Sequence, residues 1–266
     1  MLGGKRLSLM IKQYSAIATL FLFLTVSPAI GIAQTPAQTP RNPTSLASQV
    51  IDPTAPLKTI TLQDTYSPSL WGIDHRLNQA AIRANIPHDA FGMQNVFRVT
   101  VPYVTSHPTG YRGLDDVVLY DIFVYPNKWG TIAAGGDLFF GRNQGPGINT
   151  SAVGPTLGLV KKKNKWTLGV FNQNFFSFGD IATTQLQPIF AYTVSDKFSI
   201  GYGDGQYTVD WKKNKFVNAP LSFELNFISS IPHQTVRYFV NPQYNFENET
   251  GTPKWSIVGG ISFIVK

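Results

Sequence analysis

Few side chains in this chain of 266 residues have the types and spacing that catalysis requires. The sequence contains no cysteine, which excludes disulfides, thiolate metal sites and cysteine nucleophiles. A serine hydrolase needs a serine and a histidine on one face of the fold. The four histidines are scattered, and neither His107 nor His233 has a serine beside it in two-residue register. The sequence therefore predicts no catalytic residue, and we expect that the protein is not an enzyme.

Two other motifs have residue types that bind ligands in some proteins. The glycine-rich segment Gly201–Gly205 (GYGDG) lacks the strand–loop–helix context and the following Lys-Ser/Thr of a nucleotide-binding loop. Asp115 and Asp116 could bind Ca²⁺ together with Asp121, but alternation along a strand puts Asp116 and Asp121 on opposite faces. We therefore expect a β-bulge at the glycines, a solvated loop at the first two aspartates, and no bound metal or cofactor.

The first 33 residues have the three parts of an export signal. Three basic residues, Lys5 and Arg6 among them, precede an apolar run from Ser15 to Val26, and the small residues at Gly31–Ala33 suit signal peptidase. A membrane anchor is the alternative, but this run is shorter than the ~20 residues of a spanning helix. We predict that residues 1–33 are a cleaved signal peptide, which leaves a net charge of (22 − 3) − 15 = +4. This modest charge and the exported location argue against nucleic acid as a partner.

Residues 34–56 (QTPAQTPRNPTSLASQVIDPTAP) form a second segment with its own composition. They contain five prolines among Thr, Gln, Ser and Ala, and no periodicity runs through them. A segment of this kind has too little patterned apolar surface to form an element of its own. We expect a disordered or extended leader that tethers the rest of the chain.

From residue 57 to residue 266 the dominant pattern is alternation of apolar and polar residues, which is typical of strands with unlike faces. Only 14% of all residues are charged, against about 25% in an ordinary soluble domain, and 13% are aromatic. Twelve segments follow the pattern, near residues 57–66, 78–88, 94–105, 114–126, 129–141, 153–162, 165–178, 183–194, 197–211, 215–229, 232–246 and 254–266. A transmembrane strand needs about 9–11 residues. We therefore predict an all-β fold, an antiparallel transmembrane β-barrel of about 12 strands (range 10–14).

The lengths of the connections support the same fold. Short links, such as those at 162–165 and 194–197, alternate with longer ones, such as those at 106–113 and 141–152. Outer-membrane barrels have short periplasmic turns and longer outer loops, whereas a soluble sandwich has no reason to separate the two kinds. The pattern therefore favours a barrel in the outer membrane over a periplasmic, lipocalin-like binding protein.

Several segments of residues 57–266 also resemble one known family. They are Asn95–Val104 (NVFRVTVPYV), Gly113–Asp116 before a strand, FSFGD at 176–180, and the ending PKWSIVGGISFIVK. In these motifs the chain is similar to the outer-membrane transporter family named after the meta-cleavage pathway of phenol degradation. The resemblance implies an outer-membrane β-barrel that is a channel or transporter, and it implies no catalytic residues.

The ends of the expected strands suggest how the barrel meets its surroundings. Aromatic residues gather near both ends, as in the girdles that flank the apolar band of such barrels; they are Tyr125, Trp129, Trp166 and Phe198 at one end, and Trp211, Phe216, Phe246 and Trp255 at the other. Lysines cluster at 161–165 and 212–215 around asparagines typical of turns. The expected partners are outer-membrane lipid, lipopolysaccharide at the second cluster, the barrel-assembly machinery and a small-molecule solute.

The alternation also predicts which charged side chains face the lumen. The candidates are Arg83, Arg98, Asp121, Asp137, Glu224 and Arg237, whose charges sum to 3 − 3 = 0. A lumen without a ring of one sign favours small neutral or weakly charged solutes, and Phe123, Phe139 and Phe171 on the same faces would suit an apolar or aromatic one. The alternative is that these charges pair and fill the interior, which would make a structural or docking barrel with a closed lumen.

Overall fold

The computed structural model describes residues 45–141, 151–177, 181–232 and 234–265. The predicted signal peptide, the first part of the leader, and His233 lie outside the described residues. None of the helices in the described part of the chain is long and apolar enough to cross a membrane.

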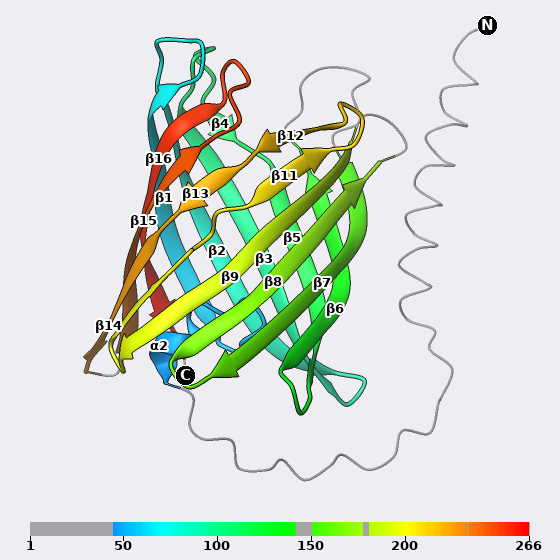
Figure 1. Ribbon diagram of the computed structural model, residues 1–266, viewed down its shortest axis with the longest axis vertical. Coiled ribbons are helices and arrows are strands. Elements are labelled where there is room, and N and C mark those ends of the chain that lie inside the picture. The colour runs from blue at the N-terminus through cyan, green and yellow to red at the C-terminus, as the bar shows by residue number, and fades with distance from the viewer. Residues whose placement is uncertain (1–44, 142–150, 178–180, 233, 266) are drawn as a thin grey trace, which may run out of the picture. The chain divides into compact units, whose positions relative to one another are not determined.

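The strands form one closed antiparallel barrel, which confirms the predicted all-β fold of about 12 strands (Figure 1). The ring runs β1-β2-β3-β5-β6-β7-β8-β9-β10-β14-β15-β16, and pairing of β16 with β1 closes it. The elements are α2 (Leu46–Gln49), β1 (Thr59–Leu70), β2 (Leu77–Ala90), β3 (Met93–Ser106), β4 (Gly113–Leu114), β5 (Val117–Pro126), β6 (Thr131–Phe140), β7 (Ser151–Lys163), β8 (Trp166–Phe176), β9 (Ala182–Ser195), β10 (Phe198–Gly201), β11 (Tyr207–Asp210), β12 (Lys215–Asn218), β13 (Pro220–Ser222), β14 (Glu224–Ile231), β15 (Gln234–Asn245) and β16 (Pro253–Ile264).

The two ends of the barrel differ as the connection lengths predict. At the turn end, two-residue links join β2 to β3, β7 to β8 and β9 to β10. At the loop end, longer segments join β1 to β2 and β15 to β16. Short turns hold neighbouring antiparallel strands in register, and the φ of 55° at Asn164 in the β7–β8 link is the left-handed conformation that such turns favour.

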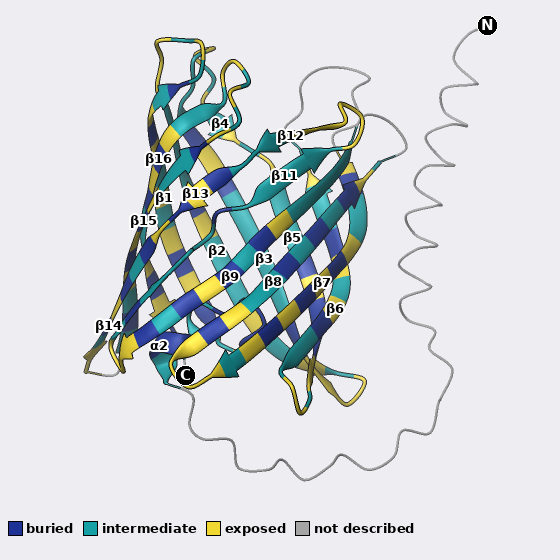
Figure 2. Cartoon of the chain, in the orientation of Figure 1, coloured by how far each residue is buried: buried dark blue, intermediate teal, exposed yellow. Residues whose placement is uncertain are grey.

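Exposed and buried residues alternate along many strands of the barrel (Figure 2). Many of the exposed residues are large and apolar, and about half of the buried ones are polar. Around β13 and β14, Leu221, Phe223 and Phe227 are 46–59% exposed, whereas Ser222 and Glu224 between them are buried. Successive residues of a strand point to opposite faces, so the alternation in the sequence produces this division. An apolar outer surface of this extent needs an apolar solvent.

Aromatic rings gather at both ends of this outer surface. At the turn end, Trp166 lies 5.1 Å from Phe190 and 4.7 Å from Tyr192, measured between ring centroids. At the loop end, the ring of Tyr244 lies 4.7 Å from that of Trp255 and 5.0 Å from that of Phe246. Such belts mark the two interfaces of a lipid bilayer in barrels of this kind.

The barrel wall is irregular where β10 gives way to β11. Both strands pair with β9, so they are two parts of one wall strand that residues 202–206 interrupt. The structure therefore shows a longer excursion at the Gly-Asp-Gly segment than the predicted β-bulge. Gly203 has a φ of +78°, and an added Cβ would lie 2.6 Å from Nδ2 of Asn241. A side chain there would clash, so glycine allows the chain to turn inward.

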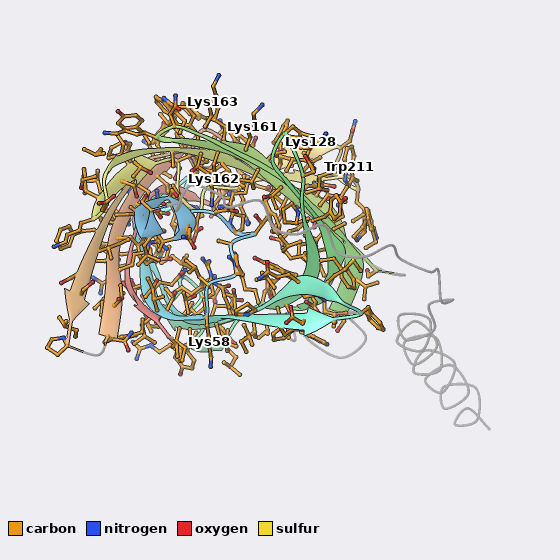
Figure 3. The ribbon with its side chains drawn as sticks, turned by 90° about the horizontal axis from the view of Figure 1, so that it is seen from below. Lys58, Lys128, Lys161, Lys162, Lys163 and Trp211 are labelled. Carbon is orange, nitrogen blue, oxygen red and sulfur yellow. The ribbon has the colours of Figure 1, made fainter. Side chains whose placement is uncertain are left out.

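The last part of the expected tether is folded. Residues 46–49 form the short helix α2, and the side chains of Ala47, Ser48, Asp52, Thr54 and Ala55 are buried. The segment lies inside the ring of strands near the turn end (Figures 1 and 3). We call residues 45–57 the plug segment. Its order comes from the barrel wall, since its own sequence has no periodicity.

Candidate functional site

The register of the strands brings two arginines to one level inside the barrel. Arg237 on β15 pairs with Ser262, which pairs with Thr61 on β1, which in turn pairs with Arg83 on β2. Directly opposed residues of an antiparallel pair share a face, so all four point into the lumen. The hydroxyls of Thr61 and Ser262 lie 2.8 Å apart and hydrogen bond to each other. This row forms one wall of the candidate site.

An ion pair crosses the lumen from this wall. Nη1 of Arg83 lies 2.6 Å from Oδ2 of Asp204. Asp204 belongs to the inward excursion between β10 and β11, on the far side of the ring from β2. The excursion therefore delivers a carboxylate to the barrel interior that a regular strand could not. Gln187 on β9 supports the excursion by donating from Nε2 to the carbonyl oxygen of Gly203 at 3.1 Å.

The second arginine belongs to a buried network. Nη2 of Arg237 lies 2.8 Å from Oε1 of Glu224, and the side chain of this carboxylate is 2% exposed. The Nδ2 group of Asn226 also donates to Oε1 of Glu224, at 2.8 Å, and Nε of Arg237 donates to Oδ1 of Asn226 at 2.6 Å. Each of the three side chains thus has two partners in the network, which is the condition under which buried charges are tolerated.

The third arginine has a different environment. Nε of Arg98 donates to Oδ1 of Asn85 at 2.6 Å, and its guanidinium carbon lies 4.9 Å from the ring centroid of Tyr120. Among the described residues, no carboxylate lies within 4.0 Å of Arg98. Arg98 is therefore held by an amide and an aromatic ring rather than by an opposite charge.

The other two predicted lumen charges lie away from this group. Asp137 on β6 is 2% exposed and accepts a hydrogen bond from Nε2 of Gln173 at 3.1 Å. Asp121 on β5 is exposed and lies 3.1 Å from Nε2 of His88. Its strand neighbours Tyr120 and Ile122 are the buried ones. The structure thus places Asp121 on the outer face of the barrel, which corrects the expectation that it faces the lumen.

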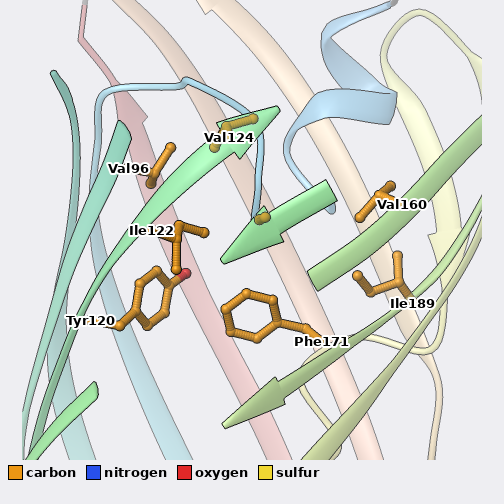
Figure 4. Close-up of a cluster of buried hydrophobic side chains, with 8 residues drawn as sticks. Val96, Tyr120, Ile122, Val124, Val160, Phe171 and Ile189 are labelled. Carbon is orange, nitrogen blue, oxygen red and sulfur yellow. The ribbon is translucent and has the colours of Figure 1, made fainter. Parts of the chain in front are cut away.

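Asp121 faces outward because the inner face of β5 belongs to an apolar part of the barrel interior. Eight buried residues from β3 and from β5 to β9 pack together inside the barrel (Figure 4); they are Val96, Tyr120, Ile122, Val124, Ala133, Val160, Phe171 and Ile189. The rings of Tyr120 and Phe171 are 5.3 Å apart. Phe139 also points inward and contacts Phe175, whereas Phe123 shares the outer face with Asp121 and packs against Phe91. Because β5 is apolar on both faces, alternation alone does not reveal which face is inside.

The plug segment is held by a buried ion pair at the turn end. Nζ of Lys162 lies 2.8 Å from Oδ2 of Asp52, whose side chain is 4% exposed. The backbone N–H and the hydroxyl of Thr54 both donate to Oδ1 of the same carboxylate, at 2.9 and 2.6 Å. Figure 3 shows Lys162 inside the ring, whereas Lys161 and Lys163 point outward. Gly158 leaves room for the plug, because a Cβ there would lie 3.3 Å from Cγ2 of Thr54.

A cavity of about 60 Å³ lies between the plug segment and the arginine wall. Its lining includes Asp52 and Ile51 from the plug and Arg98 from β3, together with the Arg83–Asp204 and Arg237–Glu224 ion pairs. The cavity has room for roughly four to six waters, since one water needs about 10–15 Å³ on this measure. Charged and polar side chains therefore surround a small free volume inside the barrel.

Within the described residues, no group of three or more His, Asp or Glu side chains is placed to hold a metal ion. Nδ1 of His107 lies 2.7 Å from the hydroxyl of Thr109, in an exposed loop.

Three charged residues of the site were missed in the sequence. Asp204 lies in a glycine-rich segment for which a β-bulge was predicted. Asp52 lies in the proline-rich leader, and Lys162 lies in a lysine cluster that is typical of a turn. An acidic residue between two glycines in mid-strand was the available signal for Asp204.

Of the comparisons with known proteins, the one with solved structures supports the fold. No family model and no curated protein sequence matches the chain. An outer membrane channel from Pseudomonas putida F1 has a similar structure, with a TM-score of 0.51 and 11% identity over 89% of this chain and 98% of that one. Outer membrane phospholipase A from Escherichia coli has a TM-score of 0.46 and 9% identity, over 82% of this chain and 97% of that one. The likeness to the channel concerns the fold alone, which is that of an outer-membrane β-barrel.

Proposed function

We propose that the chain is an outer-membrane channel or transporter for small solutes that are neutral or weakly charged. The observation that supports this most is the cavity inside the barrel, which charged side chains from β2, β3, β14 and β15 line. A barrel whose only role is structural has no need for polar free space at its centre. The apolar exterior with its two aromatic belts suits a membrane, and the fold is similar to that of an outer membrane channel.

The alternative is a structural or docking barrel with a closed lumen. The apolar cluster of β3 and β5 to β9 and the plug segment favour it, because together they fill much of the interior. The two functions differ in one respect that can be measured. A channel opens when the plug segment leaves its place, whereas a permanently filled barrel conducts under no condition.

Replacing Asp52 by asparagine should increase the conductance of the full chain in planar bilayers. The change removes the charge that binds Lys162 and leaves that lysine inside the barrel without a partner. Because Lys162 is 26% exposed, we expect the plug to be held less tightly by about 1–3 kcal/mol rather than by the full value of a buried pair. Single-channel recordings should show open events at least several times more frequent than in the unchanged protein.

The matched control is Lys161→Gln, which removes a neighbouring charge that points out of the barrel. It should leave the conductance as it was. If both Asp52→Asn and the unchanged protein show no conductance in properly folded preparations, the closed structural barrel becomes the better account.

The location follows from the same proposal. The turn end would face the periplasm and the loop end the exterior, where lipopolysaccharide phosphates would contact Lys212, Lys213 and Lys215. In the structure Glu249 partly neutralises this cluster, with its carboxylate oxygens 3.5 Å from Lys213 and 3.4 Å from Lys215. Contacts with lipopolysaccharide would therefore be weak at high ionic strength.

We expect the chain to fractionate with outer membranes and to begin at residue 34 after export. A folded barrel resists detergent until it is heated, so the unheated and heated samples should migrate differently on a gel. Mass spectrometry of the membrane fraction gives the new N-terminus. Recovery in the soluble periplasm would instead favour a lipocalin-like binding protein.

A further inference from the structure

We propose that Arg98 is the centre of a binding site for a small monocarboxylate inside the barrel. This inference rests on the proposed function, since it names the class of solute that the lumen would attract. It concerns the charges around the cavity alone, because Asp137, which also faces the interior, does not line this cavity.

Among the described residues around the cavity, Arg98 is a cation that no carboxylate pairs with. Three carboxylates line it, and each has its own cation: Asp204 has Arg83, Glu224 has Arg237, and Asp52 has Lys162. The lining itself holds three arginines and these three carboxylates, and Lys162, which lies beyond the lining, is the cation of Asp52; with Lys162 counted, the sum is 4 − 3 = +1, and Arg98 is the cation left without a carboxylate. A cation without a counter-charge inside a barrel is unfavourable, and a bound anion relieves that cost.

The chemistry of Arg98 selects the kind of anion. Its Nε is used by Asn85, so the two terminal nitrogens remain as the donors of the guanidinium. Their planar fork suits the two oxygens of a carboxylate. A monoanion brings the sum to zero, whereas a dianion would add a second negative charge next to Asp204 and Glu224. A monocarboxylate is therefore preferred over a phosphate or a dicarboxylate.

The volume of the cavity limits the size of the anion that can bind. The cavity of about 60 Å³ accepts a carboxylate with a short carbon chain while the plug segment is in place. Val50, Ile51 and Ile189 also line it and offer apolar contacts to that chain. Acetate, with four non-hydrogen atoms, is a suitable probe.

The test measures binding of ¹³C-labelled acetate to the full chain in lipid nanodiscs, by saturable broadening of its NMR signal at constant ionic strength. Acetamide, the neutral analogue of the same shape, and inorganic phosphate are compared in the same way. We expect saturable binding of acetate, and weaker binding of both other probes.

Three variants test whether Arg98 is the residue that binds acetate. Arg98→Gln keeps a donor towards Asn85 but loses the charge, and it should weaken acetate binding by at least about tenfold. Arg98→Lys keeps the charge but loses the planar fork, so it should bind acetate more weakly than the unchanged protein and more tightly than Arg98→Gln. Arg112→Gln removes an exposed arginine of the loop end and should have no effect. Heat-dependent gel migration shows whether each variant is folded, and Arg98→Lys remains informative if Arg98→Gln is not.

Several outcomes would overturn the proposal. Equal binding of acetamide and acetate would show that charge is not recognised, and unchanged binding by Arg98→Gln would show that Arg98 is not the site. Stronger binding of phosphate than of acetate would contradict the class of ligand. Conductance of the same preparations separates the two proposals: acetate binding without conductance supports the site but not the channel, and conductance without acetate binding does the reverse.

Discussion

Replacing Arg237 by methionine should lower the free energy of unfolding by about 3–5 kcal/mol. The loss arises because Glu224, whose side chain is 2% exposed, would lose the guanidinium 2.8 Å away that pairs with it in the barrel interior. The oxygen of Asn226 would lose its donor as well. Urea or guanidinium titration of the protein folded in lipid vesicles, followed by tryptophan fluorescence, measures the change.

The double variant Glu224→Gln with Arg237→Met is the control for this prediction. It removes both charges, so no ion remains unpaired, and most of the lost stability should return. Arg98→Gln is a second comparison, because in the described part of the chain no carboxylate is paired with Arg98. Its cost should be about 1 kcal/mol or less. A double variant as unstable as Arg237→Met alone would show that the ion pair is not the source of the effect.

The fold was predictable because strands that separate lipid from a polar interior must alternate. The segment from Leu221 to Phe227 shows this, since Leu221, Phe223 and Phe227 are exposed outside, whereas the polar residues Ser222, Glu224 and Asn226 are buried. The alternating turns and loops followed from the same requirement, because antiparallel neighbours are joined by short links at one end. These are local properties, and a single sequence contains them.

The site was less predictable because it depends on contacts between distant strands. Arg83 and Asp204 are 121 residues apart, and they meet only because five residues leave the wall between β10 and β11. The sequence did not show which face of β5 points into the barrel, because the apolar cluster around Ile122 makes the inner face as apolar as the outer one. The plug segment gave no signal at all, because its order is imposed by the surrounding wall.

An arginine in place of Phe223 should cost about 2–4 kcal/mol of barrel stability, because this side chain lies near the middle of its wall strand and faces outward with 46% exposure. The charge would then sit at the depth where the bilayer is least polar. Phe223→Leu, which keeps an apolar side chain, separates lost packing from the cost of the charge. We expect it to account for a minor part of the total.

The same substitution at Phe246 provides the comparison in depth. Phe246 is 63% exposed and belongs to the aromatic belt at the loop end, where its ring contacts Tyr244. Near an interface an arginine costs about 0–1 kcal/mol, since its long side chain reaches the headgroups. Both variants are compared by denaturant titration in the same vesicles. Similar costs at the two positions would mean that no apolar layer surrounds the barrel at the level of Phe223, and the assignment of this surface to the bilayer would fail.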